Sequence, residues 1–311
     1  MLQGGTETME KPQLVGGQAV LEGVMMRHHD QIAIACRRGD NSISLISEKT
    51  VPLASRFPIL GWPILRGAVA FFESLIIGVR ALNLSAAEVL QEEGEEMQDW
   101  QAFLVVLLGL GLGIALFFVL PTYLAKLVPQ HWHPVILNLV EGLIRLAIFL
   151  AYLFLVTRWS EMKRFFAYHG AEHKAIFCFE AGDPLQVESA QRYSTLHPRC
   201  GTSFLFIVMV LSILLFSLFG WPPLPQRIAI RLILLPLVAG ISYEAIRLTA
   251  RSSSPLLRLF TVPGLWLQRM TTNEPDNGQL EVALCALKAV LDPGRGQDEY
   301  CGDSPGVSNN V

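Results

Sequence analysis

The chain has 311 residues, of which 51% are hydrophobic and only 16% are charged, whereas soluble domains usually carry about 25% charged residues. Its mean hydropathy is +0.41, and its net charge of −3 gives no bulk attraction for nucleic acid, so no nucleic-acid partner is expected. The five cysteines are an odd number without a Cys-x-x-Cys pair, which argues against a disulfide framework and fits a reducing compartment.

The N-terminal part precedes the long apolar segments. Residues 1–13 are polar and Gly-rich, so we expect disorder there and no cleavable signal peptide. Residues 14–58 are expected to form a cytoplasmic element, which begins with a Gly-rich apolar motif. Alternating residues at 32–37 and 42–51, separated by turn residues at 39–41, predict a β-hairpin.

Residues 59–101 are expected to hold an amphipathic or re-entrant helix followed by an acidic linker. The stretch 62–84 is apolar except for Arg66, Glu73 and Arg80, which recur every seven residues and form one stripe on a helix. A narrow charged stripe favours a helix lying in the membrane interface. A fifth span with its stripe facing the bundle interior stays open as the alternative.

Residues 102–246 are expected to form a membrane region of four helices. A span needs about 20 apolar residues, and four segments meet this: 102–124, 134–156, one within 202–226, and 227–246. The connection at 158–201 carries six basic residues, against one between the first two spans and none at 221–226, so it is predicted to be cytoplasmic, with both termini on the same side.

Beyond the spans, residues 247–292 are expected to form a cytoplasmic segment. Pro255 and Pro263 should divide it into short pieces, and the spacing of apolar residues from 279 to 291 predicts a short amphipathic helix. Residues 293–311 are rich in Gly, Asp, Ser and Asn, and we expect a disordered tail.

The central connection carries the residues best suited to chemistry. His169 and His173 are four apart, so on a helix both imidazoles could bind one metal ion. Glu172 between them could activate a bound water, and His-x-x-Glu-His is also the inverzincin metallopeptidase spacing. Glu244, far downstream, is the candidate for a further carboxylate ligand.

A second cluster contains His197 and Cys200, at the start of the third predicted span. Spans joined by one connection are often neighbours, so both clusters could meet and form a tetrahedral zinc or iron site. Four protein ligands would indicate a structural metal, and three ligands with water would indicate catalysis. The simpler interpretation is that these histidines are polar residues at the membrane interface.

Glu141 and Arg145 lie four apart within the second predicted span. We expect them to neutralise each other inside the bundle. The alternative is a path for a proton or substrate.

Four motifs resemble those of the bacterial YqhQ-like membrane proteins. They are Gly16 to Arg27 (GGQAVLEGVMMR), Tyr168 to Lys174 (YHGAEHK), His197 to Phe204 (HPRCGTSF) and Thr271 to Pro275 (TTNEP). The resemblance covers about residues 14–292 and implies a bacterial cytoplasmic membrane protein. That family has no known function and is described as a predicted metal-dependent enzyme, which implies a metal site at His169, His173, His197 and Cys200.

The N-terminal motif contains Gln18, Glu22 and Arg27, and its two charged residues should find partners because they interrupt an apolar stretch. The motif could be a lid over the metal cluster, although a tight turn against the hairpin is the simpler prediction.

The sequence thus predicts a mainly α, polytopic membrane protein with a small N-terminal β-hairpin, and three functions fit it. The first is a metal-dependent hydrolase with Glu172 as general base, acting on a peptide, a lipid or a phosphorylated lipid. The second is a non-catalytic scaffold with a structural metal, which binds a protein partner or a second copy of the chain. The third is a small transporter using Glu141, Arg145 and Glu244. Membrane lipids surround the protein in every case.

Overall fold

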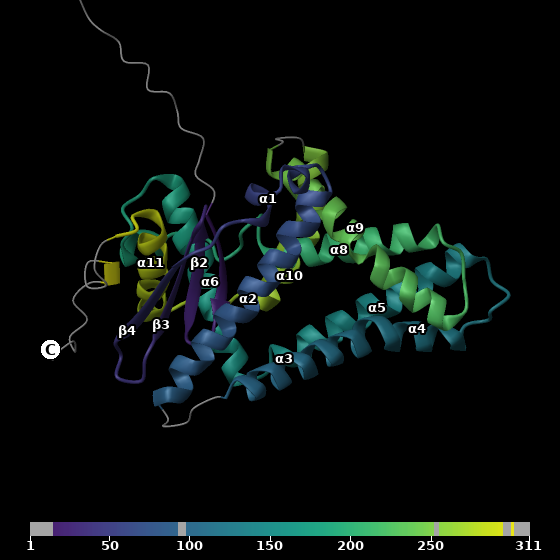
Figure 1. Ribbon diagram of the computed structural model, residues 1–311, viewed down its shortest axis with the longest axis horizontal. Helices are drawn as coiled ribbons and strands as arrows, with labels where there is room; N and C mark the ends of the chain where they lie inside the picture. Colours follow the sequence, from purple (N-terminus) through teal and green to yellow (C-terminus); the bar gives the residue numbers. More distant parts are fainter. Residues whose placement is uncertain (1–14, 93–97, 252–254, 295–299, 302–311) are drawn as a thin grey trace, which may run out of the picture.

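The computed structural model describes residues 15–92, 98–251, 255–294 and 300–301. It has two parts: a compact lobe of sheet and helices, and an elongated bundle of apolar helices (Figure 1). The predicted disordered N-terminus, 1–13, lies outside the described residues, and so does most of the predicted disordered tail, 293–311, of which only 293–294 and 300–301 are described.

Four antiparallel strands form one sheet in the order β1-β2-β3-β4. They are β1 (Val15–Val20), β2 (Gly23–His28), β3 (Gln31–Arg37) and β4 (Ile43–Lys49). The predicted hairpin is therefore confirmed as β3 and β4, and the Gly-rich motif adds a second hairpin. Its turn has Glu22 at φ 50°, and the β3–β4 turn has Asn41 at φ 68°.

Both faces of the sheet are covered. Successive side chains of a strand point to opposite faces, and β2 and β3 have buried apolar side chains on both. Val24 and Met26 face a core shared with α6 (Ser160–Ala181) and α11 (Asn277–Leu291). Met25 faces the other core, which α2 (Leu65–Glu92) closes. Figure 1 shows β2 between α11 and α2.

The predicted C-terminal helix is present as α11, but it is buried on nearly all sides instead of being amphipathic. It packs against β2, β3 and α6 at once. A disulfide joins Cys285 of α11 to Cys301. The sequence argued against a disulfide framework and did not indicate this single pair: the two α-carbons, 4.7 Å apart, are brought together by folding and not by a sequence motif.

Four helices are long and apolar enough to cross a membrane, which confirms the predicted number among the described residues. They are Leu65–Leu90 in α2, Trp100–Leu127, Pro134–Val156 (α5) and Leu224–Thr249 in α9 (Leu224–Arg251). The second of them comprises α3 (Asp99–Ile114), the π-helical turn η2 (Ala115–Val119), α4 (Leu120–Leu124) and η3 (Ala125–Leu127).

The membership of this set differs from the sequence prediction. The segment 202–226 yields α8 (Gly201–Ser217), which at 17 residues is shorter than the other four. The segment 62–84, for which an interfacial helix was favoured, forms α2 with the length and composition of a span. Its charged stripe is paired: Arg66 with Glu244, Arg80 with Glu48, and Glu73 with Arg27.

Two further expectations are corrected. Pro263 does not break the chain, because α10 (Pro255–Thr271) runs through it and packs along α8. Gly264 allows this packing, since a Cβ there would lie 2.4 Å from Ser203 Oγ. The connection 158–201 is mostly the helix α6, with α7 (Val187–Ala190) after it. Two short turns, α1 (Leu53–Arg56) and η1 (Pro58–Gly61), lead into α2.

Candidate metal centre

Three side chains with metal-binding atoms converge where α6 meets the start of α8. His169 and His173 lie one turn apart on α6, and their ring centroids are 4.4 Å apart. Cys200 is the N-cap of α8. One ligand atom of each residue lies within 4.8 Å of the others, and His169 Nε2 is 3.2 Å from Cys200 Sγ. The predicted convergence of the two motifs is therefore present for three residues.

The two imidazoles are oriented by backbone carbonyls. His169 Nδ1 lies 2.7 Å from Thr271 O, and His173 Nδ1 lies 2.5 Å from Thr195 O. A carbonyl can only accept, so each Nδ1 must donate, and in a neutral ring this leaves Nε2 with a free lone pair. Metal-binding histidines show this arrangement, because the outer hydrogen bond fixes the tautomer. Burial also lowers the pKa of His173, despite the raising effect of the Cys200 side chain.

The segment after α10 holds α6 in place. Asn273 N donates to Phe166 O at 2.9 Å, and Asn273 Nδ2 donates to Lys163 O at 2.9 Å. Gly170 allows this close approach, because a Cβ there would lie 2.1 Å from Asn273 O. Gly170 would weaken an isolated helix, but here it is required because the backbone at Asn273 packs directly against it. Thr271 O, the acceptor for His169, belongs to the last residue of α10, directly before this segment.

His197 is next to the cluster but is not part of it. Its ring centroid lies 5.6 Å from that of His173 and 4.5 Å from that of Phe177. Its Nδ1 accepts from Arg199 N at 3.3 Å, and its Nε2 faces Glu180 Oε2 at 3.6 Å. Burial lowers the pKa of His197, an effect that Glu172 opposes. The structure therefore brings together three of the four predicted ligands and gives His197 a different set of neighbours.

Glu172 is buried against the first strand. A Cβ on Gly17 of β1 would lie 2.8 Å from Glu172 Cγ and Oε1, so only glycine leaves room for this carboxyl group. Burial raises the pKa of Glu172, while His169 and His197 act in the opposite direction. The carboxyl group is thus electrostatically coupled to both histidines without belonging to the three-residue cluster.

The N-terminal motif belongs to the sheet and packs on the surrounding helices. Glu22 accepts from Arg164 Nε at 2.6 Å and lies 3.4 Å from the Tyr168 hydroxyl, both on α6. Arg27 is 3.9 Å from Glu73 of α2. Both charged residues thus have partners, as expected, and the motif forms a structural hairpin.

Gln18 of the same motif packs against α2. A Cβ on Gly78 would lie 2.5 Å from Gln18 Oε1, so a glycine at position 78 allows the sheet to approach the helix.

The intramembrane candidates have other partners. Glu141 pairs with Arg145 at 3.0 Å, as predicted, but it also pairs with Arg231, which sequence spacing could not indicate. Glu244 is bound by Arg66 through two hydrogen bonds of 2.6 and 2.5 Å. It is therefore paired with Arg66 and is not part of the His/Cys cluster.

An apolar cavity of about 450 Å³ lies within the helices beside the cluster. Its lining includes Thr202 and Thr271, which contact Cys200 and His169 respectively, and also Arg145 of α5. Most other lining side chains are apolar, among them Phe71, Phe117, Phe149, Phe204, Val208 and Met209. The cavity thus extends from the His/Cys cluster toward the buried arginines.

Together these features define a helical membrane protein with a His/Cys cluster where its sheet-bearing lobe joins the bundle. Comparison with known proteins gives the family. Residues 62–293 match the model described as "Protein of unknown function (DUF1385)". The chain is also 34% identical over 295 residues to the "Uncharacterized protein YqhQ" of Bacillus subtilis (strain 168), covering 90% of this chain and 93% of that protein. The chain belongs to this family of unknown function, and no solved structure matches it.

Proposed function

We propose that this protein is a membrane-embedded, metal-dependent hydrolase. The observation that carries the proposal is the orientation of His169 and His173: both Nδ1 atoms face carbonyls, and both Nε2 atoms are left for the space shared with Cys200. Three nitrogen and sulfur ligands suit zinc or iron, and three protein ligands leave a coordination position for water. A bound ion would supply an activated water at neutral pH.

The chain's own residues provide the remaining functions. Glu172 is the candidate general base, because its carboxyl group is coupled to His169 and its raised pKa brings it closer to the range in which a base works at neutral pH. The cavity lined by Thr202 and Thr271 favours a lipid substrate over a peptide, since it offers apolar side chains to a hydrocarbon chain. Substrates would enter from the membrane.

We place this site at the cytoplasmic face of a bacterial membrane, with both termini on that side. The basic residues of 158–201 support this orientation, since positive loops stay in the cytoplasm. The packing of the N-terminal sheet and α11 against α6 supports one shared side for these segments. A shared side requires two crossings between the sheet and α6, made by the Trp100–Leu127 helix and α5, so α2 would lie at the membrane interface without crossing. It also requires two crossings between α6 and α11, made by α8 and α9.

The first experiment is metal analysis of the purified, detergent-solubilised protein by mass spectrometry. We expect about one zinc or iron per chain, lost in a His169→Ala/His173→Ala variant and in Cys200→Ser. His197→Ala should keep the metal, since its nitrogens face Arg199 and Glu180. Cys178→Ser, at another buried cysteine, is the matched control. A wild-type protein without metal would refute the proposal.

A second candidate function is a scaffold in which the same His/Cys cluster binds a structural metal. The Glu172→Gln variant distinguishes this scaffold from the hydrolase. If the protein is a hydrolase, this variant keeps its metal and loses hydrolysis of a panel of membrane lipids. If the metal is structural, wild type hydrolyses none of the panel, and loss of the ligands lowers the yield of folded protein, as metal binding couples to folding. In the scaffold function, the protein would bind a protein partner or a second copy of the chain. Transport is supported least, because Arg66 already binds Glu244 and the cavity is apolar.

A further inference from the structure

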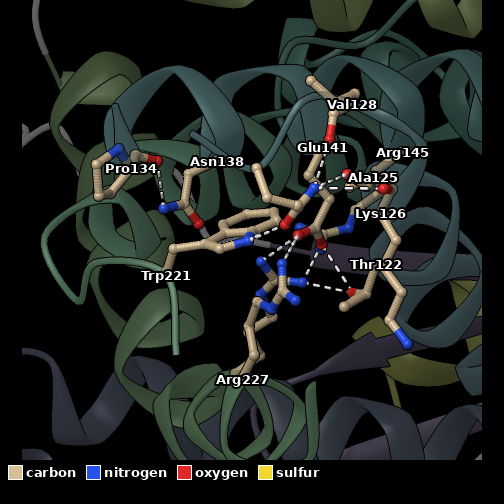
Figure 2. Close-up of polar contacts among 12 residues, drawn as sticks. Thr122, Ala125, Lys126, Val128, Pro134, Asn138, Glu141, Arg145, Trp221 and Arg227 are labelled. Atoms are coloured by element: carbon tan, nitrogen blue, oxygen red, sulfur yellow. Dashed lines mark hydrogen bonds and ion pairs between the residues drawn. The ribbon is translucent and has the colours of Figure 1, made fainter. Parts of the chain in front are cut away.

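The helical bundle contains a buried cluster with more positive than negative charge. Glu141 (1% exposed) is surrounded by Arg145, Arg227 and Arg231, which are 8%, 5% and 2% exposed. Glu141 is the only acidic residue between positions 100 and 160, and positions 201–243 contain none. One carboxylate therefore faces three guanidinium groups, which remain protonated in proteins. Figure 2 shows Glu141 with Arg145 and Arg227.

Two of the arginines already use both oxygens of Glu141. Arg145 Nη2 donates to Oε1 at 3.0 Å, and Arg231 Nη2 donates to Oε2 at 2.5 Å. Thr122 adds a hydroxyl donor to Oε1 at 2.8 Å and lies 2.5 Å from Arg231 Nη1. The carboxylate thus has little capacity left for the third arginine.

Arg227 is that third arginine. Its Nη1 lies 3.8 Å from Glu141 Oε2, which is too far for a hydrogen bond. Arg227 Nε and Nη1, and Arg231 Nε, are buried without a hydrogen-bond partner among the described residues. The guanidinium carbon of Arg227 lies 3.6 Å from the Trp221 ring centroid. Trp221 is in turn fixed by its Nε1 donating to Gln130 at 2.8 Å (Figure 2).

Arg227 and Arg231 line a small, partly open cavity, together with Asn138, Gly220 and Pro222 among others. It holds about 10 Å³, enough for about one water or one oxygen atom. A water there would accept hydrogen bonds but would leave the excess positive charge without compensation. An anion would accept the hydrogen bonds and also compensate the positive charge. Among anions, a phosphate matches the planar fork of arginine better than a monatomic ion does.

We propose that Arg227 and Arg231 bind a phosphate group, which inserts one oxygen between them and remains otherwise at the mouth of the cavity. The position suits a membrane phospholipid. Arg227 is in the first turn of α9, and Trp221 precedes that helix, so both are at the level where headgroups and aromatic side chains meet. The same chemistry would accept free phosphate, and the experiment separates the two sources.

The test uses the full-length protein, purified in detergent with either phosphatidylglycerol or a diacylglycerol that has the same chains without phosphate. Native mass spectrometry counts the lipids retained. We expect wild type to retain about one phosphatidylglycerol per chain and no diacylglycerol, and Arg227→Gln to retain about tenfold less, as expected for a lost charge-assisted contact. Arg158→Gln, an exposed arginine beyond the other end of α5, should behave as wild type.

A second measurement identifies the source and does not depend on the variant. Inorganic phosphate is added to delipidated wild type, and thermal unfolding is compared with that in sodium chloride of equal ionic strength. Stabilisation by phosphate without retention of phosphatidylglycerol assigns the site to the free ion. The proposal is overturned if wild type shows neither effect, or if a folded Arg227→Gln matches wild type in both.

Discussion

The close approach at Gly170 allows a quantitative prediction for Gly170→Ala. In an isolated helix this substitution would stabilise by about 0.5–1 kcal/mol. Here the new Cβ would lie 2.1 Å from Asn273 O, a backbone atom that can move only if its segment moves. Asn273 would then lose its two hydrogen bonds to α6, worth about 1 kcal/mol each. Crowding adds about 1–3 kcal/mol, so we expect a net destabilisation of about 2–4 kcal/mol.

The same displacement should weaken metal binding, because Thr271 O orients His169 and lies two residues from Asn273. Loss of such an outer hydrogen bond typically lowers metal affinity about 10- to 100-fold. The measurements are thermal unfolding in detergent and zinc competition with a chromogenic chelator. Gly111→Ala is the matched control, since nothing lies within 4 Å of its new Cβ on α3. A Gly170→Ala protein with wild-type stability and zinc affinity would refute this account of the motif.

Two further predictions concern ionisable residues away from the cluster. Burial lowers the pKa of His28, so near and below its unfolded pKa of about 6.5 the unfolded chain binds more protons than the folded protein. Stability should therefore decrease as the pH is lowered through this range. His28→Phe should reduce the slope of stability against pH, and equal slopes for the variant and wild type would contradict the assignment. Glu244→Gln leaves Arg66 without its paired carboxylate and should lower the temperature of thermal unfolding, although solvent screening of this partly exposed pair limits the loss. The Arg66→Glu/Glu244→Arg variant should recover part of that loss, and failure of Glu244→Gln to destabilise would show that the pair contributes little.

Local sequence signals were sufficient where a structure depends on neighbours in the chain. The turn residues 39–41 predicted the β3–β4 hairpin correctly, and long apolar stretches marked the spans at 102–124 and 134–156. The four-residue spacing of His169 and His173 correctly placed both rings on one helical face. Each of these features follows from the periodicity of one element.

The errors arose where distant segments decide the outcome. The Gly-rich motif was not recognised as strands, because Gly17 and Gly23 have little strand preference alone; they are needed where Glu172 and the backbone of β3 approach closely. Spacing gave the charged stripe of α2 but not its partners, because Arg66 and Glu73 pair with residues on α9 and β2. Pro263 was expected to end a helix, and packing against α8 maintains it.

The two sites also depend on pairings that spacing does not encode. Arg231 lies 90 residues from Glu141, and Thr271 lies 102 residues from His169. A sequence signal did exist for the arginine cluster, since three arginines and one acidic residue occur in otherwise apolar segments, and buried charges must find partners. Counting charges over all the spans, instead of within each span, would have indicated an unmatched positive site.

The apolar cavity gives the two proposals a common geometric basis. Arg145 borders this cavity and pairs with Glu141, while Thr202 and Thr271 border it beside Cys200 and His169. A lipid chain in the cavity would therefore lie between the His/Cys cluster and the arginine cluster. Cys200 begins α8, whereas Arg227 follows the far end of α8, so the two clusters lie at opposite ends of the spans. The ester bonds of a phospholipid adjoin its phosphate, so a lipid held by Arg227 and a substrate of the cluster would be separate molecules. The hydrolase proposal therefore stands or falls without the phosphate site.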